Sequence, residues 1–556
     1  MNKSEAKTVI ALYNAAKTLR SRNESDWRLA SAYCLPRQYN SWQGQGSMPM
    51  TGAPSTEAIK RIAYDSTGAR SLPKYAAVLQ QIATPHRTLY QMLEASNKDL
   101  MKIHRVKKYF DELNERMFRL RYNPTANFIQ AAFEVYLSIG AYGNGPCFLG
   151  RRQPNAISKN GGFFYRACAM ADCYFLVNDQ GEVCKFFRDL WLTYNQFVSK
   201  FPNSNIPEQM SKVSDVEKDT RYFHFVHYVE PRDGYDRESL GVDKYPVRGS
   251  FLFVEKPEYV GDEEGYRSFP YLTPRTFTAA GDPYGFAPSM HALSALGTAS
   301  AVKKTTIKQG QKAVDPAYIA FDDGVLNGTV DARPGHLNYG GVSKEGKPLV
   351  HALPTGDFRV SEKILQDERA DIEDSFFVFI FKLLEEKREM TATEVIERAA
   401  KESGLLEPTM GRLQTEWNAR FVDRELDIAQ ELGEVGELPP ELIEAKGEYE
   451  IIYTSPLAKS VYAQQTSGFM RAVEMSLNIV NATQDPSHLD HFNFDVAIPE
   501  ISNNLAVPAR WMNDEETKNA LGEQRKQAAQ ETQLIENAGP LAGAAKAISN
   551  TQQGAA

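Results

Sequence analysis

A chain of 556 residues is too long for one ordinary hydrophobic core, so we expect several domains or one large elaborated architecture. Hydrophobic residues make up 42% of the chain and charged residues 24%, values that exclude a mainly disordered protein. The formal net charge of -8 at pH 7 excludes a protein that coats nucleic acid through a broad basic surface, although a local basic patch remains compatible with it.

The cysteines and the hydropathy pattern favour a soluble, non-secreted protein. The cysteine count is odd and includes no Cys-X-X-Cys pair, which predicts reduced and mostly buried thiols at Cys34, Cys147, Cys168, Cys173 and Cys184. The first twenty residues lack the continuous apolar core of a signal peptide. The most apolar run, FFVFIF at 376–381, is far too short to span a bilayer.

Helical patterns dominate the first 140 residues. Apolar residues at helical spacing predict a helix over 3–33 that Pro36 ends, and a surface loop rich in Gly, Pro, Ser and Gln over 36–56. Further helices are expected at about 57–82, 98–120 and 125–139. The last of them stops at the glycine-rich stretch GAYGNGPCFLG, 140–150.

The period changes between 160 and 275. Short runs of aromatic and β-branched residues, separated by turn signals, predict a mainly antiparallel β region there. A helix follows at 288–312 with Pro288 at its first position, and a second at about 360–386, separated by a turn-rich stretch at 313–357. Each helix has about 25 residues and would be roughly 37 Å long, so we expect a matched pair joined by a small module.

The C-terminal part begins with a charged stretch followed by a helix start. Thr391 and Glu394 fit a capping box behind EEKREM, 385–390, which predicts a surface turn and then a helix over about 392–403. Another helix is expected at about 409–432, a strand at YEIIYTS and a helix at 458–480. The last forty or so residues favour a polar helix and a flexible tail.

Two motifs resemble a nucleotide-binding loop and a metal site, but neither has the residues that such a site requires. GVSKEGKP, 341–348, has P-loop spacing, but Pro348 replaces the hydroxyl residue that ligates Mg²⁺, and no amphipathic helix follows. The pairs HFVH, 224–227, and HLDH, 488–491, lack convergent ligands, and residues three apart in a strand face opposite sides. We therefore expect no cofactor, no metal and no catalytic residue.

One pattern of charge is more informative. The helix at 288–312 concentrates lysines and the helix at 360–386 concentrates acids, and the residues singled out are Lys303, Lys304, Lys308, Lys312, Glu362, Asp367, Glu368 and Asp371. In a single chain these charges are solvated faces that can pair with each other. In a ring of subunits they would form belts of opposite charge between neighbours or around a central bore.

Five segments in this order resemble the head-to-tail connector, or portal, family of short-tailed, podovirus-type bacteriophages. They are YDSTGARSLPKYAAVLQQIATPHRTLYQML at 64–93, AYGNGPCFL at 141–149, YFLVNDQGEVCKFFRDLWLTYNQF at 174–197, PRTFTAAGDPYGFAPSMHAL at 274–293 and REMTATEVIERAAKESGLLEPTMGRLQTE at 388–416. The resemblance extends from roughly residue 8 to residue 480.

The resemblance implies an α+β, predominantly helical portal fold with wing, long-helix stem, small α/β clip and helical crown. Its regions would be a wing at 1–287 that is helical and then β-rich, stem helices at 288–312 and 358–384 flanking a clip at 313–357, a channel loop at 385–391, wing helices at 392–450, a crown at 451–500, and a C-terminal helix and flexible tail at 501–556. The Thr391/Glu394 cap would then fix the end of the channel loop.

The resemblance also implies a function. Twelve copies would form a ring, a dodecamer, at one capsid vertex of the virion after assembly in the host cytoplasm, and its channel would pass double-stranded DNA during genome packaging and ejection. The implied partners are the major capsid and scaffolding proteins, the terminase packaging motor and tail adaptor proteins, with no membrane. ATP hydrolysis would belong to the motor, so the chain itself would not be an enzyme.

In such a ring the channel loop would consist of Glu385, Glu386, Lys387, Arg388, Glu389 and Met390. A uniformly basic bore would hold DNA by counterion release, so we hypothesise that only Lys387 and Arg388 make transient, sequence-independent phosphate contacts. Two other classes stay open: a nucleic-acid-dependent enzyme, and an internal virion ejection protein. The second would require long uninterrupted helices without the β-rich middle.

Overall fold

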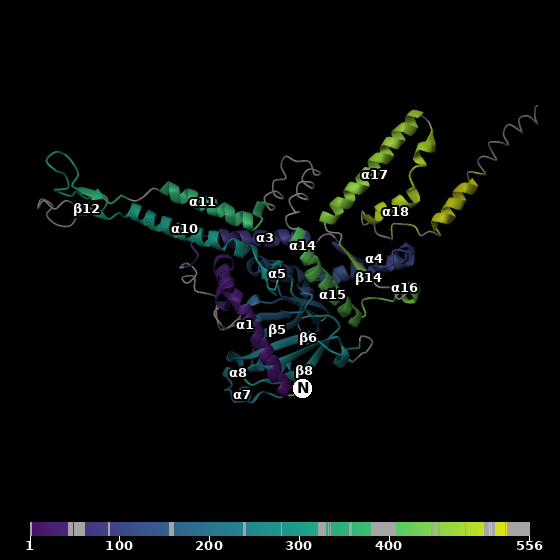
Figure 1. Cartoon of the computed structure of the whole chain (residues 1–556), viewed down its shortest axis with the longest axis horizontal. Coiled ribbons are helices and arrows are strands. Elements are labelled where there is room, and N and C mark those ends of the chain that lie inside the picture. The colour runs from purple at the N-terminus through teal and green to yellow at the C-terminus, as the bar shows by residue number, and fades with distance from the viewer. Residues whose placement is uncertain are drawn as a thin grey trace, which may run out of the picture. The chain divides into compact units, whose positions relative to one another are not determined.

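The computed structural model describes residues 3–42, 48, 62–86, 89–154, 161–236, 241–279, 281–320, 330–331, 333, 335–354, 358–379, 407–445, 449–453, 456–483, 485–504, 511, 513, 517–528 and 530. It mixes helices and strands, as the sequence predicts (Figure 1). The chain forms two compact units: unit 1 contains Met1–Thr88 and Leu120–Leu432, and unit 2 contains Leu89–Arg119 and Gly433–Ala556. This division interrupts the single region expected at 1–287, because 89–119 associates with the C-terminal part.

The predicted β region of unit 1 centres on a five-stranded antiparallel sheet. Its order is β4-β5-β6-β7-β8, with bounds Cys173–Val177, Val183–Thr193, Tyr222–Pro231, Val247–Phe253 and Glu258–Tyr266. Helix α1, Lys3–Cys34, lies across one face, where Tyr13 packs among Phe187, Val226 and Leu252. On the other face Phe197 of α6, Tyr194–Lys200, and Met210 of α7, Glu208–Ser211, join a cluster of phenylalanines from β6 and β7.

A second, three-stranded sheet of unit 1 supports its helical layer. It has the order β3-β2-β9, with bounds Gly162–Ala167, Cys147–Arg152 and Tyr271–Leu272. Helices α5, Phe128–Tyr142, and α15, Arg420–Glu431, pack on it, and α3, Thr67–Ala83, packs on α5. Phe128 contacts Tyr165, Trp417 and Phe421 in the core between these elements.

A pair of helices leaves the sheets of unit 1 side by side (Figure 1). After α9, Pro288–His291, which has Pro288 at its first position as predicted, α10 runs over Leu293–Val314 and α11 over Phe358–Ser375. Between them β12, Tyr318–Ala320, pairs with β13, Val350–Ala352. Helix α11 is interrupted at 376–377, where Phe377 turns the backbone with a φ of 52°; residues 378–379 are helical again, and the rest of the predicted helix, 380–384, lies outside the described residues. We call α10, α11 and the β12–β13 hairpin the stem.

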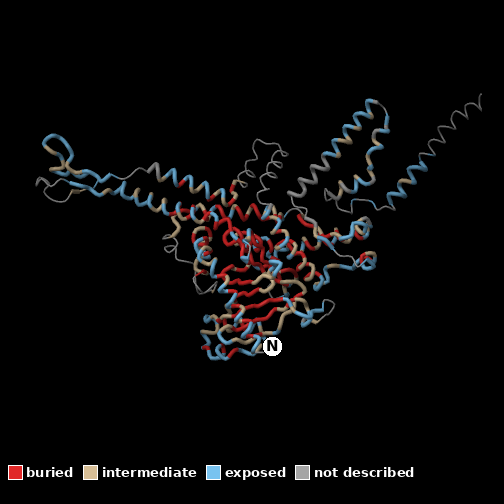
Figure 2. Tube along the Cα trace, viewed as in Figure 1, coloured by how far each residue is buried: buried red, intermediate tan, exposed pale blue. Residues whose placement is uncertain are grey.

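Burial divides unit 1 into two zones. Buried residues concentrate in the sheets and the helices that cover them, whereas the outer part of α10 and the β12–β13 hairpin are exposed (Figure 2). An isolated chain therefore leaves the outer stem without a covering layer.

One predicted loop is partly helical. Residues 36–56 were expected to form a surface loop, but Pro36–Trp42 is the 3-10 helix η1. The reason is the burial of Trp42, whose ring lies 5.4 Å from Trp27 and 5.2 Å from Tyr142 between ring centroids. Of the rest of that loop the structure describes residue 48 alone.

Shorter elements complete unit 1. They are η4 (Pro124–Ala126), η5 (Met170–Asp172), α8 (Glu217–Thr220), η6 (Val242–Lys244), β10 (Phe277–Thr278), β11 (Gly285–Phe286), α14 (Glu407–Arg412) and the π-helix η8 (Leu413–Ala419). A π-helix of this length is rare in proteins and often marks a functional position.

Unit 2 is held together by strands that are far apart in the sequence. Strand β1, Gln91–Ala95, pairs antiparallel with β14, Tyr449–Tyr453, in the predicted YEIIYTS strand. Asn114 of α4, His104–Arg121, exchanges two hydrogen bonds with the Leu93 backbone, at 2.8 and 3.0 Å. The unit also contains η3 (Leu100–Lys102), α16 (Pro440–Glu444), α17 (Pro456–Thr483), η9 (Pro486–Leu489) and α18 (Phe494–Asn504).

Among the described residues, no helix combines the length and apolar character that crossing a bilayer requires.

Candidate functional site

The charged residues predicted on the stem lie where the sequence places them. On α10 Lys303 and Lys304 are half-buried and Lys308 and Lys312 are exposed. On α11 Glu368 is half-buried, and Glu362, Asp367 and Asp371 are exposed. Although α10 and α11 pack together, no ion pair within the described residues joins these lysines to these acids.

A short segment before α3 binds both stem helices instead. The Ser300 hydroxyl of α10 donates to the Ile62 carbonyl at 2.9 Å and accepts from the Tyr64 N–H at 2.8 Å. Lys304 lies over the Tyr64 ring, 5.1 Å from its centroid. Arg369 of α11 donates to Asp65, and although burial alone would raise the pKa of Asp65, hydrogen bonds from Thr67 and Arg369 lower it. The base of the stem is thus fixed to the helical layer of unit 1.

The hairpin end of the stem is apolar and exposed. The exposed side chains of this kind are Tyr318, Ile319, Leu337, Tyr339, Val342 and Leu353. Tyr339 is 84% exposed, which is unusual for a large aromatic side chain. Clustered exposed apolar residues indicate a surface that a partner covers.

The P-loop-like stretch lies in the same hairpin. Ser343 N–H donates to the Lys347 carbonyl at 2.8 Å, and Val342 and Pro348 form an isolated β-bridge. Strand β13 follows, not a helix. The stretch therefore lacks the helix N-terminus on which a phosphate is held in a P-loop.

The predicted channel loop, Glu385 to Met390, and its cap, Thr391 and Glu394, lie outside the described residues. The segment that contains them, 380–406, is bracketed by described elements of unit 1, namely α11 before it and α14 after it. Just before this segment in the chain, Phe376 and Phe377 pack against Tyr75 of α3, with ring centroids 6.4 and 6.3 Å from that of Tyr75.

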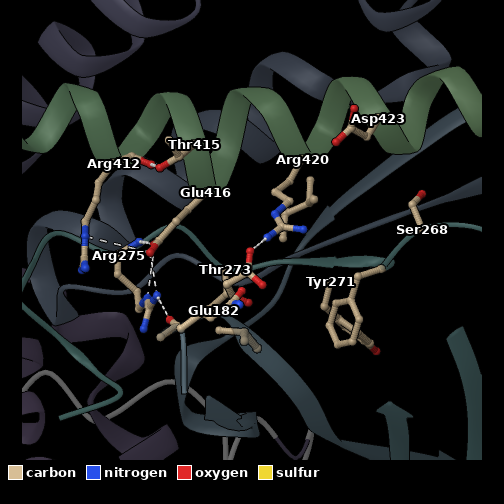
Figure 3. A pocket seen from close by; sticks show the side chains of 15 residues that line it. Glu182, Ser268, Tyr271, Thr273, Arg275, Arg412, Thr415, Glu416, Arg420 and Asp423 are labelled. Atoms are coloured by element: carbon tan, nitrogen blue, oxygen red, sulfur yellow. Dashed lines mark hydrogen bonds and ion pairs between the residues drawn. The ribbon is translucent and has the colours of Figure 1, made fainter. Parts of the chain in front are cut away.

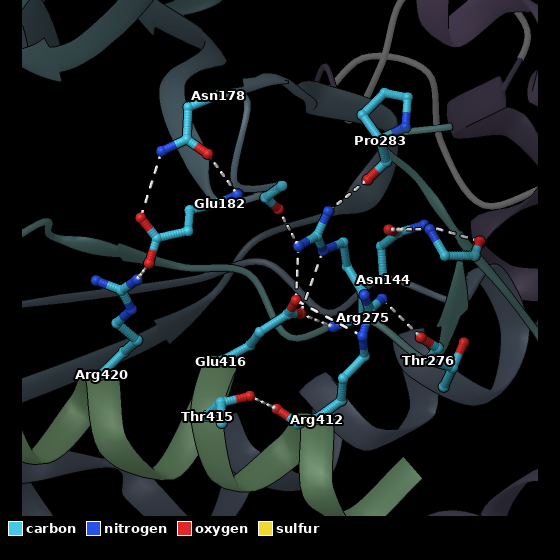
Figure 4. A network of polar contacts seen from close by, with 12 residues as sticks. Asn144, Asn178, Glu182, Arg275, Thr276, Pro283, Arg412, Thr415, Glu416 and Arg420 are labelled. Carbon is cyan, nitrogen blue, oxygen red and sulfur yellow. Dashed lines mark hydrogen bonds and ion pairs between the residues drawn. The ribbon is translucent and has the colours of Figure 1, made fainter. Parts of the chain in front are cut away.

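Glu416, which follows that segment in the chain, belongs to a buried cluster of hydrogen-bonded polar groups that the sequence did not predict. Arg275 is 4% exposed and contacts Glu416 of η8 through its backbone N–H, at 2.9 Å, and through Nε and Nη2, at 3.2 and 2.6 Å (Figure 4). Nη1 donates to the Pro283 carbonyl at 3.0 Å and Nη2 to the Gly181 carbonyl at 2.7 Å. We call this group the Arg275 junction.

The junction also includes a close approach of two backbones. Asn144 forms a β-bridge with Arg275, and its Oδ1 accepts from the Gly285 N–H at 2.9 Å. Gly143, at the C-terminus of α5, has a φ of 74°, and a Cβ built on Gly285 would lie 2.2 Å from the Gly143 carbonyl oxygen. Only glycine fits at both positions.

Four of the five segments that carry the family resemblance meet at this junction. Asn144 belongs to 141–149, Gly181 to 174–197, Arg275 and Pro283 to 274–293, and Glu416 to 388–416. The sequence signal that could have predicted the junction is that each of these segments contains a charged residue or a glycine. Nothing in a single sequence pairs those positions.

A pocket of about 300 Å³ lies beside the junction, between η8, the start of α15 and residues 268–275 (Figure 3). Its charged side chains pair among themselves: Arg275 with Glu416, and Arg420 with Glu182. Arg412 donates to the Thr276 carbonyl at 3.2 Å. The pocket therefore presents balanced charge, which favours solvent over an ionic ligand.

The histidines of β6 face opposite sides of the sheet, as predicted. His224 stacks on Trp191 and lies 3.1 Å from Asp189 on the side of α1. His227 contacts the Tyr271 hydroxyl at 2.6 Å and stacks on Phe251 on the other side. Over the part of the chain that the structure describes, no group of three or more His, Cys, Asp or Glu side chains is arranged to hold a metal ion.

Comparison with known proteins identifies the class to which this architecture belongs. The family described as "Bacteriophage head to tail connecting protein" matches residues 6–512, and the chain therefore belongs to this family of phage head–tail connectors. Among curated proteins, the "Probable portal protein" of Bordetella phage BPP-1 is 24% identical over 515 residues, covering 88% of this chain and 86% of that protein.

Solved structures give a weaker comparison. A chain in "Virion of native gene transfer agent (GTA) particle" matches with 13% identity and a TM-score of 0.28, over 71% of this chain and 93% of that chain. One in "Neck of native GTA particle computed with C12 symmetry" matches with 14% identity and a TM-score of 0.31, over 70% and 86%. These scores are too low to support an argument about this chain.

Proposed function

We propose that this protein is a portal protein that assembles into a ring, with twelve copies as the family resemblance implies. The ring would occupy one capsid vertex of the virion, and double-stranded DNA would pass through it into the head and out again. Membership of the head-to-tail connector family supports this proposal, as does a curated relative named as a probable portal protein.

The observation that best supports ring assembly is the set of exposed charged and apolar side chains on the stem of a single chain. Lys308 and Lys312 of α10 and Glu362, Asp367 and Asp371 of α11 are exposed, and within the described residues no ion pair joins these lysines to these acids. The hairpin between the two helices exposes large apolar side chains. Neighbouring copies would satisfy both features, because the α10 surface of one copy complements the α11 surface of the next.

The hairpin end, as the clip, would dock the terminase motor and later the tail adaptors, while other surfaces would meet capsid and scaffolding proteins. Burying the exposed apolar side chains of this hairpin would drive such docking. The chain itself would supply no catalysis. An ATPase assay on the purified protein, with and without DNA, tests that part, and turnover above background would favour a nucleic-acid-dependent enzyme.

The ring is tested by negative-stain electron microscopy with native mass spectrometry on the same sample. We expect closed rings with a central hole and a mass near twelve chains of 62.4 kDa. A stable monomer or dimer under assembly conditions would contradict the proposal.

The channel loop is tested separately. We propose that Lys387 and Arg388 contact phosphates in transit, so that replacing both with alanine changes the length of DNA packaged or its retention in the head. Replacing Glu385 and Glu386 with glutamine provides the matched control. Unchanged packaging and retention in the Lys387/Arg388 variant would remove the loop from the mechanism and leave the ring intact.

A further inference from the structure

Strand β9 borders the pocket beside the Arg275 junction and is an edge strand. In the three-stranded sheet β3-β2-β9 it is the outer strand, and among the described residues it pairs with β2 alone. An edge strand presents backbone donors and acceptors with which another chain can pair. What this edge can bind therefore depends on where the outward backbone groups of residues 268–275 point.

Hydrogen bonds on one side fix the direction of the backbone along this stretch. The Pro270 carbonyl accepts from the Leu149 N–H of β2 at 2.9 Å. The Pro274 carbonyl accepts from the Gly145 N–H, just before β2, at 3.0 Å. Even-numbered residues of the stretch thus direct their backbone groups toward β2. Because successive residues of a strand direct these groups to opposite edges, the odd-numbered residues direct theirs outward.

The outward edge faces a helix. Arg275 is an odd-numbered residue of the stretch, and its N–H donates outward to Glu416 of η8 at 2.9 Å. The pocket of about 300 Å³ lies between η8, the start of α15 and residues 268–275 (Figure 3). Tyr271 and Thr273, the preceding odd-numbered residues, both line it. Their backbone N–H and carbonyl groups therefore point toward the helix, across the pocket.

The polar groups on this side of the pocket have no hydrogen-bond partner among the described residues. This holds for the backbone N–H and carbonyl of Tyr271 and Thr273 and for the Thr273 hydroxyl, and Thr273 is only 5% exposed. It also holds for the buried hydroxyl of Ser268, which points toward the helix (Figure 3). Buried polar groups in proteins are normally hydrogen-bonded, so this row indicates a ligand with donors and acceptors of its own.

The ligand that fits this pocket carries no charge. Arg275 pairs with Glu416, and Arg420 pairs with Glu182, so these four charged side chains are already occupied. An additional charge would lose its hydration without gaining a counter-ion. A volume of about 300 Å³ is at the small end of the range for ligand sites, which suits a few residues of chain.

The open part of the edge fits a short extended segment. At about 3.3 Å per residue, Tyr271 to Thr273 spans about 7 Å, so about three residues of a partner strand would face it. Glu416 closes the edge at Arg275, because it occupies that N–H. The two prolines of the stretch do not interrupt pairing, since the N–H that each lacks would point toward β2.

We propose that this edge is a docking site at which an extended, uncharged segment of a partner protein adds as a strand to β9, between β9 and the η8–α15 helix. The backbone of the segment pairs with Tyr271 and Thr273, and these main-chain hydrogen bonds supply the affinity. Small side chains that carry a hydroxyl or an amide bond to the hydroxyls of Ser268 and Thr273, and these contacts supply the specificity.

The occupant is a protein other than a second copy of this chain. The stem surfaces through which copies would meet in the proposed ring carry exposed charges on α10 and α11. The charged side chains Arg275, Glu416, Arg420 and Glu182 of this pocket are paired within the chain, so they offer no complement to those surfaces.

The first experiment uses the blocked tripeptide acetyl-Thr-Val-Thr-amide as the probe. It is uncharged, its β-branched residues favour an extended conformation, and its symmetric sequence presents the same side chains in either strand direction. Saturation-transfer NMR on the full-length protein with millimolar peptide measures binding. We expect transfer to this peptide and none to acetyl-Asp-Val-Asp-amide, which has the same length. Absence of transfer to the threonine peptide would overturn the proposal.

Pairing through the backbone is tested with methylated peptides on the wild-type protein. Methyl groups on both threonine nitrogens remove the donors on one edge of the peptide, and a methyl group on the valine nitrogen removes the donor on the other edge. We expect one of the two peptides to bind ~2- to 10-fold more weakly for each hydrogen bond lost and the other to bind as the unmodified peptide does. Equal binding of the two methylated peptides would contradict strand addition.

Variants at Thr273 separate its backbone from its side chain. Thr273→Pro removes the outward N–H and should abolish transfer to the peptide. Thr273→Val keeps that N–H and removes only the hydroxyl, so it should weaken binding ~2- to 10-fold. Binding by Thr273→Pro equal to that by the wild type would exclude this edge as the site. Because the methylated peptides probe the unaltered protein, the test does not depend on how Thr273→Pro folds.

The source of the occupant is tested by comparing dissociated chains with assembled rings. We expect the same transfer per chain in both states. Peptide binding by dissociated chains that disappears in rings would show that a neighbouring copy fills the edge, and would overturn the assignment to a partner protein. The peptide experiments do not require ring assembly, so the failure of one proposal leaves the other standing.

Discussion

At the residue scale, a buried ion pair of unit 1 joins two chain segments 304 positions apart. Glu425 of α15 is fully buried and accepts from Arg121 at 2.8 and 2.5 Å and from the Tyr165 hydroxyl. Removing one partner of a buried pair leaves the other charge without compensation.

We therefore expect Glu425→Gln to lower the free energy of unfolding of unit 1 by about 3–5 kcal/mol. The matched control is Glu182→Gln, which breaks the half-exposed pair with Arg420 and should cost about 0–1 kcal/mol. Denaturant unfolding followed by tryptophan fluorescence measures both, since Trp417 packs in the same core. Equal losses in the two variants would contradict the ranking.

His227 gives unit 1 a pH dependence of known sign. Burial is the main cause that lowers its pKa, against Glu264, which raises it, and Lys200 and Arg188, which lower it further. The unfolded state then binds the proton more readily than the folded state, so the stability from neutral His227 is complete above about pH 6.5 and is lost as pH falls. Hydrogen bonds lower the pKa of Glu264 to about 2 despite its burial, so its own loss comes only in stronger acid.

We expect the melting temperature of the wild-type protein to fall between pH 7 and pH 5, and the slope to be smaller in His227→Gln. The control is His336→Gln, whose side chain is 51% exposed and whose replacement should leave the slope unchanged. Thermal unfolding at half-unit pH steps checks this, and parallel slopes for all three proteins would refute the assignment to His227.

Local patterns predicted some of these residues and not others. The opposite orientation of His224 and His227 follows from strand alternation alone, and the position of Pro288 follows from its fixed φ. Arg275 and Glu416 were not predicted, because they are 141 positions apart and each resembles an ordinary surface charge in its own segment. Burial of such a pair depends on how distant segments pack.

At the element scale, the contact between α5 and β11 depends on two glycines. Gly143 and Gly285 bring their backbones so close that no Cβ fits at Gly285 without displacing the Gly143 carbonyl. Since the Gly143 carbonyl also accepts from the Thr276 N–H at 3.0 Å, a displacement would loosen the Arg275 junction.

Gly285→Ala should therefore destabilise unit 1 by about 1–3 kcal/mol, as overpacking against a rigid group does. Gly310→Ala is the control: Gly310 lies in α10, where an added Cβ would meet no described atom within 4 Å outside the helix's own backbone. Alanine there should be neutral or stabilise the helix by up to about 1 kcal/mol. The shift in melting temperature of each variant, relative to the wild type, measures these changes in stability. A Gly285→Ala protein as stable as the wild type would show that the backbones can separate freely.

The predictability of the elements depended on whether their signals were local. Helix α1 and strand β14 carry periodicity and β-branched residues of their own and were found with accurate limits. Strand β1 was missed, because QMLEA has no clear alternation and becomes a strand by pairing with β14. η1 was missed because glycine and proline nearby outweighed Trp42, whose burial is set by Trp27 and Tyr142.

At the scale of the whole molecule, the stem predicts how copies would recognise each other. If the lysines of α10 face the acids of α11 in the next copy, reversing one side should prevent ring closure and reversing both should restore it. The interaction should also weaken as salt rises, since exposed charges are screened over about 10 Å at 0.1 M.

We expect Lys308→Glu with Lys312→Glu to abolish rings, Asp367→Lys with Asp371→Lys to do the same, and the four changes together to recover them. The control is Lys212→Glu. Lys212 is an exposed lysine that directly follows α7, outside the stem, and this variant should assemble normally. Native mass spectrometry at two salt concentrations measures the outcome. Rings formed by either reversed pair alone would mean that these charges do not form the interface.

The interleaved units were beyond prediction from one sequence. The boundary between 88 and 89 carries no glycine- or proline-rich linker, and the segment 89–119 joins the C-terminal part only through tertiary contacts. Chain order therefore suggested one N-terminal region where the structure has parts of two units.

The pairing of β1 with β14 has a consequence for the time at which the protein can fold during its synthesis. Position 91 leaves the ribosome roughly 360 residues before position 453, its partner in the sheet. At roughly 5–20 residues per second, translation takes about 20–70 s to cover that distance. During that interval residues 91–95 lack the partner that makes them a strand, and unit 2 can close only after unit 1 has been fully translated.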